Sequence, residues 1–327
     1  MQAHQELERE FASFIGTEHA VAVNTGTAAL HLALAALGVS PGDEVIIPDF
    51  TMAACAYAVM YCGATPIFID CDDSMNIDPK RIEQVIGPRT KAIMPVHIYG
   101  WPCDMDPIME IARRRGIKVV EDCSEAHGAT YRGQAVGSIG DVGCFSLYRN
   151  KIVHAEEGGV ITTNDAVLAD KMRDMKNMAF GAKHDYLHGP LGFNYRMTDS
   201  QAYMALGSLS RVRENLKKRE DIAGWYDTRF QSSTMPRPPG SVVWMYPLFV
   251  PEDRQEAVTL SAPGVRHFFK PMSWQPFAGG CARVGDSANS GRLAHKGVYL
   301  PVHEAMTKEE VMGISERVFQ ALTMPRP

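Results

Sequence analysis

The sequence predicts an α/β fold with a mostly parallel central sheet flanked by helices, followed by a smaller C-terminal α+β domain. In the N-terminal half, short apolar segments alternate with helical segments, which is typical of parallel sheets covered by helices on both faces. The chain has 327 residues, a length that usually divides into two domains. A long helical, charged stretch then precedes a second region of short strands. We therefore expect a large domain at residues 1–205, and a connecting helix with a small domain at 206–327.

The expected elements follow in a regular order. The strands of the main sheet are expected at 19–23, 44–47, 65–69, 91–96, 117–121, 142–147 and 160–163. The helices around them are expected at 1–14, 28–37, 51–61, 79–86, 104–115 and 166–178, with a long helical stretch at 199–229. The small domain is expected to hold strands at 242–250 and 265–269 and a last helix at 307–322.

Composition and charge are those of an ordinary soluble enzyme. Hydrophobic residues make up 45%, charged residues 22%, and the formal net charge is -5. This balance offers no basic surface for a nucleic-acid polymer or an anionic membrane. The N-terminus is polar and no apolar run reaches membrane-spanning length. The seven cysteines are scattered without a C-x-x-C pair, so we expect a cytoplasmic protein with reduced thiols.

Two polar features stand where expected strands end, which is where ligands bind in open α/β sheets. The turn at 24–27 opens a helix, so its backbone N–H groups and the helix dipole could bind an anion. From this turn alone, an ordinary helix cap by Thr25 or Thr27 is the better interpretation. Asp122 follows an apolar strand directly. It is either a helix cap or a partner for a bound cation.

Lys151 follows the expected strand 142–147 and precedes the glycine pair Gly158-Gly159. Burial can lower the pKa of a lysine and free its amine as a nucleophile, for example to form a Schiff base with an aldehyde cofactor. From this stretch alone, an exposed lysine on a loop is the better interpretation, because lysines are mostly exposed.

Taken together in order, the motifs of this chain resemble the sugar-nucleotide aminotransferases, fold-type I enzymes that depend on pyridoxal 5'-phosphate (PLP). No single motif is decisive, but the ordered series is very specific and covers nearly the whole chain. The motifs are NTGTAAL (24–30), GDEVIIP (42–48), GATP (63–66), RTKAI (89–93), VHIYG (96–100), EDCSEAHGA (121–129), Phe145-Ser146 with Lys151, EGG (157–159) and NYRM (194–197).

The resemblance implies a fold-type I aminotransferase that moves an amino group from a donor, expected to be glutamate, to a keto-sugar nucleotide or similar carbonyl substrate. Lys151 would hold PLP as an internal aldimine and shuttle a proton between the substrate carbon and the cofactor. Asp122 would pair with the pyridinium nitrogen and keep it protonated.

The resemblance also implies the remaining cofactor contacts. The backbone at Gly26 and Thr27, with the Ser146 hydroxyl, would bind the phosphate. Asn194 would reach the phosphate of a neighbouring subunit's cofactor, so the active sites of a homodimer would be shared. From its residue type alone, Asn194 could instead cap its own turn before the helix at 199.

Four departures from the family pattern concern the substrate more than the cofactor. Met52 stands where an aromatic ring usually stacks on the cofactor and can cover a ring face only loosely. Glu125 stands where many relatives have a glutamine beside the phenolic oxygen, and Arg149 is a candidate cation to offset its charge. Glu156 occupies a position where glycine is common. By the same resemblance, we expect the sequence to lack the family's usual N-terminal segment before the first helix.

These departures motivate a second hypothesis: PLP-dependent deamination or decarboxylation of a non-sugar amine, such as an amino-acid-modified nucleotide. A third hypothesis, a non-catalytic PLP-fold module, is opposed by Lys151. No metal is expected, because His184 and His188 have i, i+4 spacing but nothing completes a tetrahedral set. For the substrate pocket, Phe269, Trp274 and Phe277 are candidates, either to stack on a nucleobase or to pack in the core.

Overall fold

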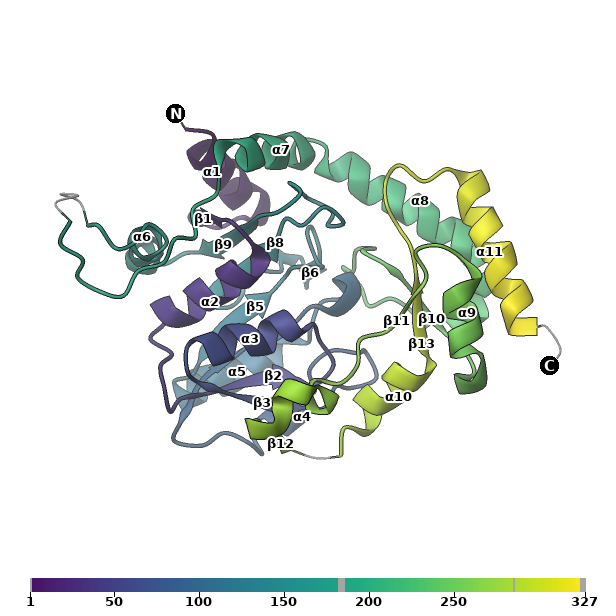
Figure 1. Ribbon diagram of the computed structural model, residues 1–327, viewed down its shortest axis with the longest axis horizontal. Coiled ribbons are helices and arrows are strands. Elements are labelled where there is room, and N and C mark those ends of the chain that lie inside the picture. The colour runs from purple at the N-terminus through teal and green to yellow at the C-terminus, as the bar shows by residue number, and fades with distance from the viewer. Residues whose placement is uncertain (1, 182–185, 285, 324–327) are drawn as a thin grey trace.

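The computed structural model describes residues 2–181, 186–284 and 286–323, and its main feature is an eight-stranded sheet (Figure 1). The strand order is β1-β9-β8-β5-β4-β2-β3-β12. The strands are β1 (His19–Val23), β2 (Glu44–Pro48), β3 (Thr65–Ile69), β4 (Thr90–Ile93), β5 (Lys118–Asp122), β8 (Val142–Ser146), β9 (Gly159–Thr163) and β12 (Ala282–Val284). All neighbours from β8 to β12 pair in parallel, and only β9 pairs antiparallel, with β1 and β8. The expected mostly parallel sheet is confirmed.

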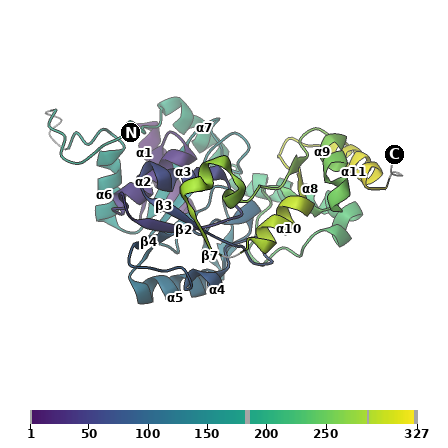
Figure 2. The ribbon, with the colours of Figure 1, turned by 60° about the horizontal axis from the view of Figure 1, so that its bottom comes forward.

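Helices cover both faces of this sheet because its strands alternate buried side chains between two apolar clusters. Val45 and Ile47 belong to the larger cluster, whereas Ile46 between them joins the cluster of the opposite face. In Figure 2, α2 and α3 lie on one side of the sheet, with α4 and α5 on the other. The helices of this region are α1 (Ala3–Ile15), α2 (Gly26–Ala36), α3 (Ala53–Tyr61), α4 (Pro79–Ile82), α5 (Met105–Arg115), α6 (Ala166–Met175) and α7 (Asp199–Leu209).

The C-terminal part builds a second, smaller body around its own apolar cluster, which spans residues from Ile222 to Val318. The helix α8 (Val212–Phe230) leads into it, and α11 (Lys308–Thr323) packs beside α8 (Figure 1). Its sheet has the order β10-β13-β11. The other elements of this part are β10 (Tyr246–Phe249), α9 (Gln255–Ser261), β11 (Arg266–His267), α10 (Ala288–Lys296) and β13 (Gly297–Leu300).

One segment from the C-terminal part returns to the large sheet, because β12 pairs in parallel with β3. The division of the chain near residue 205 stays a prediction. Short elements complete the fold: β6 (Thr130–Tyr131), β7 (Gln134–Ala135), η1 (Ile98–Gly100), η2 (Gln231–Ser233), η3 (Glu252–Arg254), η4 (Met272–Trp274) and η5 (Pro276–Gly280).

The structure differs from the expected elements at several boundaries. The stretch 199–229, expected as one long helix, forms the two helices α7 and α8, because the helix is interrupted at Ser210 and Arg211. The expected strand 242–250 is shortened to β10, since the Val242 N–H donates to the Gly100 carbonyl at 3.0 Å instead of extending the sheet. Helix α4 is a single turn, and β12 and α10 were not expected.

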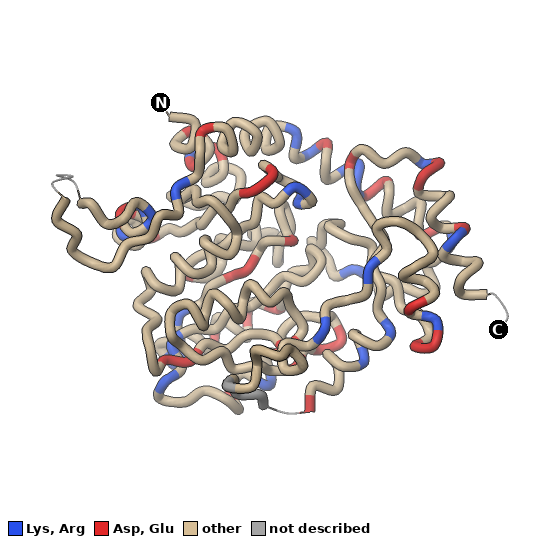
Figure 3. The backbone as a smooth tube through the Cα atoms, in the orientation of Figure 1, with Lys and Arg blue, Asp and Glu red and all other residues tan. Residues whose placement is uncertain are grey.

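Charged residues of both signs are interspersed along α8 and α11 (Figure 3). Within residues 2–181, 186–284 and 286–323, every helix is too short or too polar to cross a membrane.

Candidate active site

A cavity of about 500 Å³ opens at the carboxyl ends of the parallel strands. Its walls come from the start of α2, the start of α3, the end of β5, the loop after β8 and the C-terminal part of the chain. Seven of the eight site residues expected from the sequence line it: Gly26, Thr27, Met52, Asp122, Glu125, Ser146 and Lys151. The chain thus brings an amine, two carboxyl groups and a helix N-terminus to one cavity.

The start of α2 forms one end of the cavity. The Thr25 side chain caps this helix and accepts a hydrogen bond from the Ala28 N–H at 3.0 Å. The N–H groups of Gly26 and Thr27, the first two helical residues, have no partner within the helix and are suited to bind an anion. A Cβ at Gly26 would lie only 2.7 Å from the Cβ of Ser146. Glycine therefore allows the Ser146 hydroxyl to approach the helix start.

Asp122 ends β5 and is buried. Its Oδ1 accepts the Ser124 N–H at 2.9 Å, and its Oδ2 accepts the Cys55 thiol at 3.1 Å. Cys55 also contacts the Thr51 hydroxyl at 3.3 Å. Burial and the charge of Asp122 raise the pKa of Cys55 well above its usual value, so the thiol keeps its proton and can donate to Asp122. The carboxylate is thereby fixed at the cavity wall.

Lys151 lies in the loop between β8 and β9 and is buried. The interpretation as an exposed loop lysine is therefore wrong. Its Nζ lies 4.0 Å from the centre of the Trp244 ring. Burial lowers the pKa of Lys151, and the negative charges of Glu125 and Asp122 oppose part of this shift. A buried amine whose pKa is lowered is suited to nucleophilic and proton-transfer chemistry.

Glu125 is a second buried carboxyl group of the cavity, with its Oε2 accepting the Tyr99 N–H at 2.8 Å. Burial raises the pKa of Glu125 to about 7, and the positive charge of Lys151 limits that rise. Arg149 is not the offsetting cation suggested by the sequence. Its side chain is 64% exposed and pairs with Glu156 at 3.5 Å. The offsetting charge instead belongs to Lys151.

The aromatic walls of the cavity come from distant parts of the chain. Phe269, one of the sequence candidates, lines the cavity together with Trp244 and Tyr299. Sequence reasoning missed Trp244 and Tyr299, because no spacing connects them with the lysine loop. The other two candidates pack elsewhere: Trp274 contacts His295 and Phe277 contacts Tyr57, with ring centroids 5.3 and 4.8 Å apart. Met52, 56% exposed, stands at the edge of the cavity.

Asn194 is the one expected site residue that does not line the cavity described for its own chain. It forms an isolated bridge with Asn177, beside the bridge of Val23 with Arg196. Its alternative role, as the cap of its own turn before α7, stays a prediction; the cap of α7 itself is the Thr198 side chain. Of the histidine pair considered for a metal, His184 lies outside the described residues.

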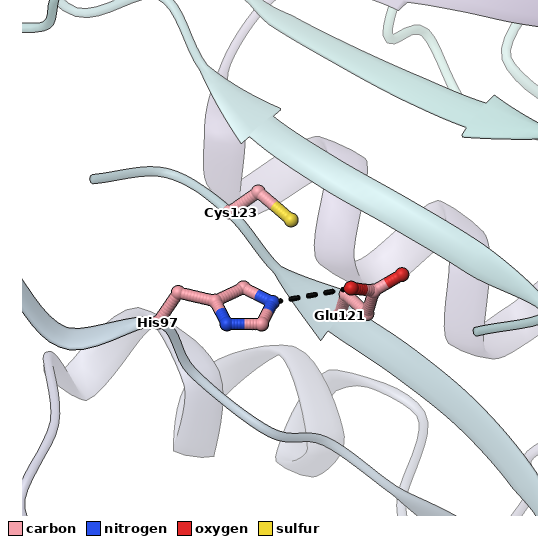
Figure 4. A group of neighbouring side chains, drawn as sticks. All are labelled: His97, Glu121 and Cys123. Atoms are coloured by element: carbon pink, nitrogen blue, oxygen red, sulfur yellow. Dashed lines mark hydrogen bonds and ion pairs between the residues drawn. The ribbon is translucent and has the colours of Figure 1, made fainter. Parts of the chain in front are cut away.

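Within the described chain, His97, Glu121 and Cys123 form the group whose ligand atoms could reach one metal ion (Figure 4). Their hydrogen bonds favour a structural role instead. The Cys103 N–H donates to Nδ1 of His97 at 3.0 Å, so Nε2 carries the ring proton and donates to Glu121 at 3.2 Å. Glu121 also accepts three backbone N–H groups from Gly137, Ile139 and Gly140. With its acceptor sites occupied, this carboxylate joins β5 to the loop between β7 and β8.

The cavity residues fit pyridoxal phosphate. The helix start with Ser146 can bind its phosphate, and the close approach at Gly26 leaves these donors exposed to the cavity. Asp122, fixed by two donors, can bind a protonated ring nitrogen. The amine of Lys151 shares the cavity with both.

Comparisons with known proteins agree with this fit. The sequence model of the DegT/DnrJ/EryC1/StrS aminotransferase family matches residues 2–319. GDP-perosamine synthase of Caulobacter vibrioides is 43% identical over 97% of this chain and 88% of its own. The structure of S. venezuelae DesV in complex with a ketimine intermediate is 32% identical, with a TM-score of 0.90 over 100% of this chain and 91% of that one.

A DegT DnrJ EryC1 StrS aminotransferase from Brucella abortus superimposes with a TM-score of 0.92 at 27% identity, over 98% of this chain and 91% of that chain. These relatives favour amino transfer over the deamination or decarboxylation hypothesis, and they support fold-type I. The chain therefore belongs to the DegT/DnrJ/EryC1/StrS aminotransferase family, whose members are pyridoxal-phosphate-dependent transferases.

Proposed function

We propose that this aminotransferase moves an amino group from glutamate to a keto-sugar nucleotide. The observation that carries the proposal is the shared cavity of Lys151, Asp122 and the N-terminus of α2. The names of the relatives support the substrate class. They include GDP-perosamine synthase and a dTDP-3-amino-3,4,6-trideoxy-alpha-D-glucose transaminase, the latter 34% identical over 95% of this chain.

In this proposal the bound cofactor supplies an electron sink for negative charge at the substrate carbon. Lys151 would hold the cofactor through Nζ, and its amine would move the proton at that carbon. Asp122 keeps the ring nitrogen protonated, and the Cys55 thiol holds the carboxylate in place. The N–H groups of Gly26 and Thr27 and the Ser146 hydroxyl bind the phosphate.

The remaining walls are assigned to the substrate and to the cofactor ring. Met52 stands at the cavity edge, where its thioether can cover one ring face loosely. Glu125 is held by the Tyr99 N–H and, with a pKa of about 7, can carry or release a proton beside Lys151 near neutral pH. Trp244, Phe269 and Tyr299 offer flat apolar surfaces against which a sugar or a base can pack.

We also propose a homodimer with shared active sites, in which Asn194 binds the phosphate in the partner's cavity. Two observations support it. Asn194 does not line the cavity described for its own chain. Large apolar side chains are exposed on α3 and α7, which is typical of surfaces covered by another protein. These are Tyr57, Met60 and Tyr61 on α3, and Tyr203 and Met204 on α7.

A cytoplasmic location is supported by seven free cysteines.

The proposal is tested by adding amino donors to the purified protein with bound pyridoxal phosphate. Glutamate should convert the cofactor to its amine form, seen as a change in absorbance, with formation of one keto acid per site and without release of ammonia. Borohydride reduction before this step should fix the cofactor to Lys151, as found by peptide mapping. Cofactor fixed to another lysine would contradict the assignment of Lys151, and ammonia release would favour deamination.

A further inference from the structure

The loop that carries Lys151 is held on both sides by polar groups from later parts of the chain. Before the lysine, the Asn150 carbonyl accepts the Trp244 indole N–H at 3.1 Å. After it, the Ile152 carbonyl accepts the Asn215 amide at 3.3 Å, and the His154 N–H donates to the Ser208 hydroxyl at 3.1 Å. The position of the amine therefore depends on α7, α8 and the segment before β10.

Arg219 of α8 is the charged residue at the centre of this arrangement, and only 1% of it is exposed. One terminal nitrogen, Nη1, donates to the carbonyls of Trp244 and Val302, each at 3.0 Å. The other, Nη2, donates to Glu304 at 3.0 Å and to the Asn150 carbonyl at 3.5 Å. Burying a guanidinium group is costly unless its partners are well placed. The group thus ties the lysine loop to two C-terminal segments.

Glu304 extends these contacts to the far side of the loop. Its Oε2 accepts from Arg219, and its Oε1 lies 3.3 Å from Nε2 of His154. Burial alone would raise the pKa of Glu304, but the His154 hydrogen bond and the charge of Arg219 lower it to about 2. Glu304 is therefore ionised at neutral pH and available to both partners.

Trp244 connects Arg219 with the amine of Lys151, because it contacts both residues. Its carbonyl accepts from Arg219, its indole N–H binds the Asn150 carbonyl, and its ring faces Nζ of Lys151 at 4.0 Å. A shift of the guanidinium group would move both the ring and the peptide next to the lysine.

We propose that Arg219 and Glu304 form a positioning pair that holds Lys151 and the Trp244 ring in their working arrangement. The inference rests on the proposed function, in which Lys151 carries the cofactor. The pair touches neither cofactor nor substrate and acts through Trp244, Asn150 and His154.

The charges of the pair also act on the lysine nitrogen. Changing them should therefore change the pKa of that nitrogen, which a purely structural contact would not do. The positive charge of Arg219 lowers the pKa of Lys151, in addition to the larger effect of burial. The other titratable or charged groups that act on Lys151 or on the pair are Asp122, Glu125, Cys55, His127 and His154. Removing Arg219 should therefore raise the pKa of the lysine nitrogen. Removing the charge of Glu304 leaves Arg219 uncompensated and should lower that pKa.

The test compares Arg219→Met, Arg219→Lys and Glu304→Gln in the full-length protein with bound pyridoxal phosphate. The pH dependence of the bound cofactor's absorbance reports the pKa of the lysine-linked nitrogen, and the borohydride fixation rate reports its placement. Arg219→Met should raise this pKa, because the positive charge of Arg219 no longer acts on the lysine nitrogen. Glu304→Gln should lower it, and Arg219→Lys should restore part of the wild-type value.

Two controls separate positioning from general stability. Arg237→Met removes an ion pair with Glu220, the residue after Arg219, at the outer side of α8. Tyr226→Phe removes a 3.1 Å hydrogen bond from α8 to the Pro301 carbonyl without touching the lysine loop. Both should leave the absorbance titration and the fixation rate unchanged, whatever their melting temperatures.

The outcomes distinguish the inference from the function on which it rests. If borohydride fails to fix the cofactor to Lys151 in the wild type, the proposed function is wrong. If it labels Lys151 but the variants change only the melting temperature, the positioning pair is overturned. Should Arg219→Met not fold, Glu304→Gln decides, because a lowered pKa of the lysine-linked nitrogen is still required in that variant.

Discussion

The thiol of Cys55 donates a hydrogen bond to Oδ2 of Asp122 over 3.1 Å, and both side chains are buried. This contact leads to a first prediction. Cys55→Ala leaves that oxygen without its donor, and a lost hydrogen bond to a charged group is worth roughly 1.5 kcal/mol, or about 10-fold in kcat. Cys55→Ser supplies a hydroxyl donor and should recover most of the rate. Equal rates in the alanine variant and the wild type would show that Asp122 needs no such support.

Neutralising Asp122 should have a larger effect. Asp122→Asn should bind pyridoxal phosphate with most of the wild-type affinity, because the phosphate contacts remain. Its turnover should fall by orders of magnitude, since an amide cannot keep the ring nitrogen protonated. Cofactor titration and steady-state kinetics measure the two effects separately. Asp73→Asn, at a fully solvated position whose side chain is 92% exposed, serves as the control, and near-normal turnover of Asp122→Asn would exclude the assigned role.

The raised pKa of Glu125 predicts that the stability of the folded protein depends on pH. The folded protein keeps the proton of Glu125 up to a pKa of about 7, whereas the ordinary value is 4.5. The unfolded chain therefore loses this proton first, and stability falls as the pH rises from 4.5 to 7. Above pH 7 the full loss of unfolding free energy from ionising the buried Glu125 is reached, and it amounts to at most ~3 kcal/mol.

Glu125→Gln removes the titration and should be more stable than the wild type at pH 8, with the difference shrinking toward pH 5. Urea unfolding of the cofactor-free protein at both pH values measures it. A stability difference that does not change with pH would contradict the assigned pKa.

Mixed dimers test the shared active sites. A Lys151→Ala subunit combined with an Asn194→Ala subunit has one site with both defects and one with neither. The site with intact Lys151 receives Asn194 from its partner, so activity should return to roughly half of wild type per dimer. Activity no higher than in the two separate homodimers, or a fully active monomer in sedimentation, would rule out sharing.

Glu121 should behave as a structural acceptor rather than a metal ligand. Glu121→Ala leaves the N–H groups of Gly137, Ile139 and Gly140 without their acceptor and should cost about 3 kcal/mol or more of unfolding free energy. A chelator should leave the melting temperature of the wild type unchanged. Stoichiometric zinc in the purified protein, lost together with stability on chelation, would reverse this interpretation.

The sequence predicts most of the large domain, because its signals are local. Apolar strands, helix starts and the turn at Gly26 are each encoded within a few residues, and β1 and β3 have the expected bounds. The ordered motifs also single out Lys151 and Asp122, and both line the cavity. The aromatic walls could not be predicted, since Trp244 and Tyr299 reach the cavity only through the packing of the C-terminal part.

Charge partners were equally hidden from the sequence. Arg149 is close to Lys151 in the chain, yet it faces solvent beside Glu156, and Lys151 itself offsets the charge of Glu125. Arg219 resembles any charged position on a helix until the fold encloses it. Burial and long-range contacts, which depend on the complete tertiary structure, decide these roles.

Because β12 pairs with the edge of β3, that edge stays unpaired during most of the synthesis of the chain on the ribosome. The backbone of Ile67 and Phe68 finds its outer partner only when residues 282–284 have been synthesised. Until then the nascent chain presents an open, apolar strand edge, which is a template for association with other chains. Truncated forms ending before residue 282 should therefore aggregate more readily than the full chain, even though they contain the other seven strands of the large sheet.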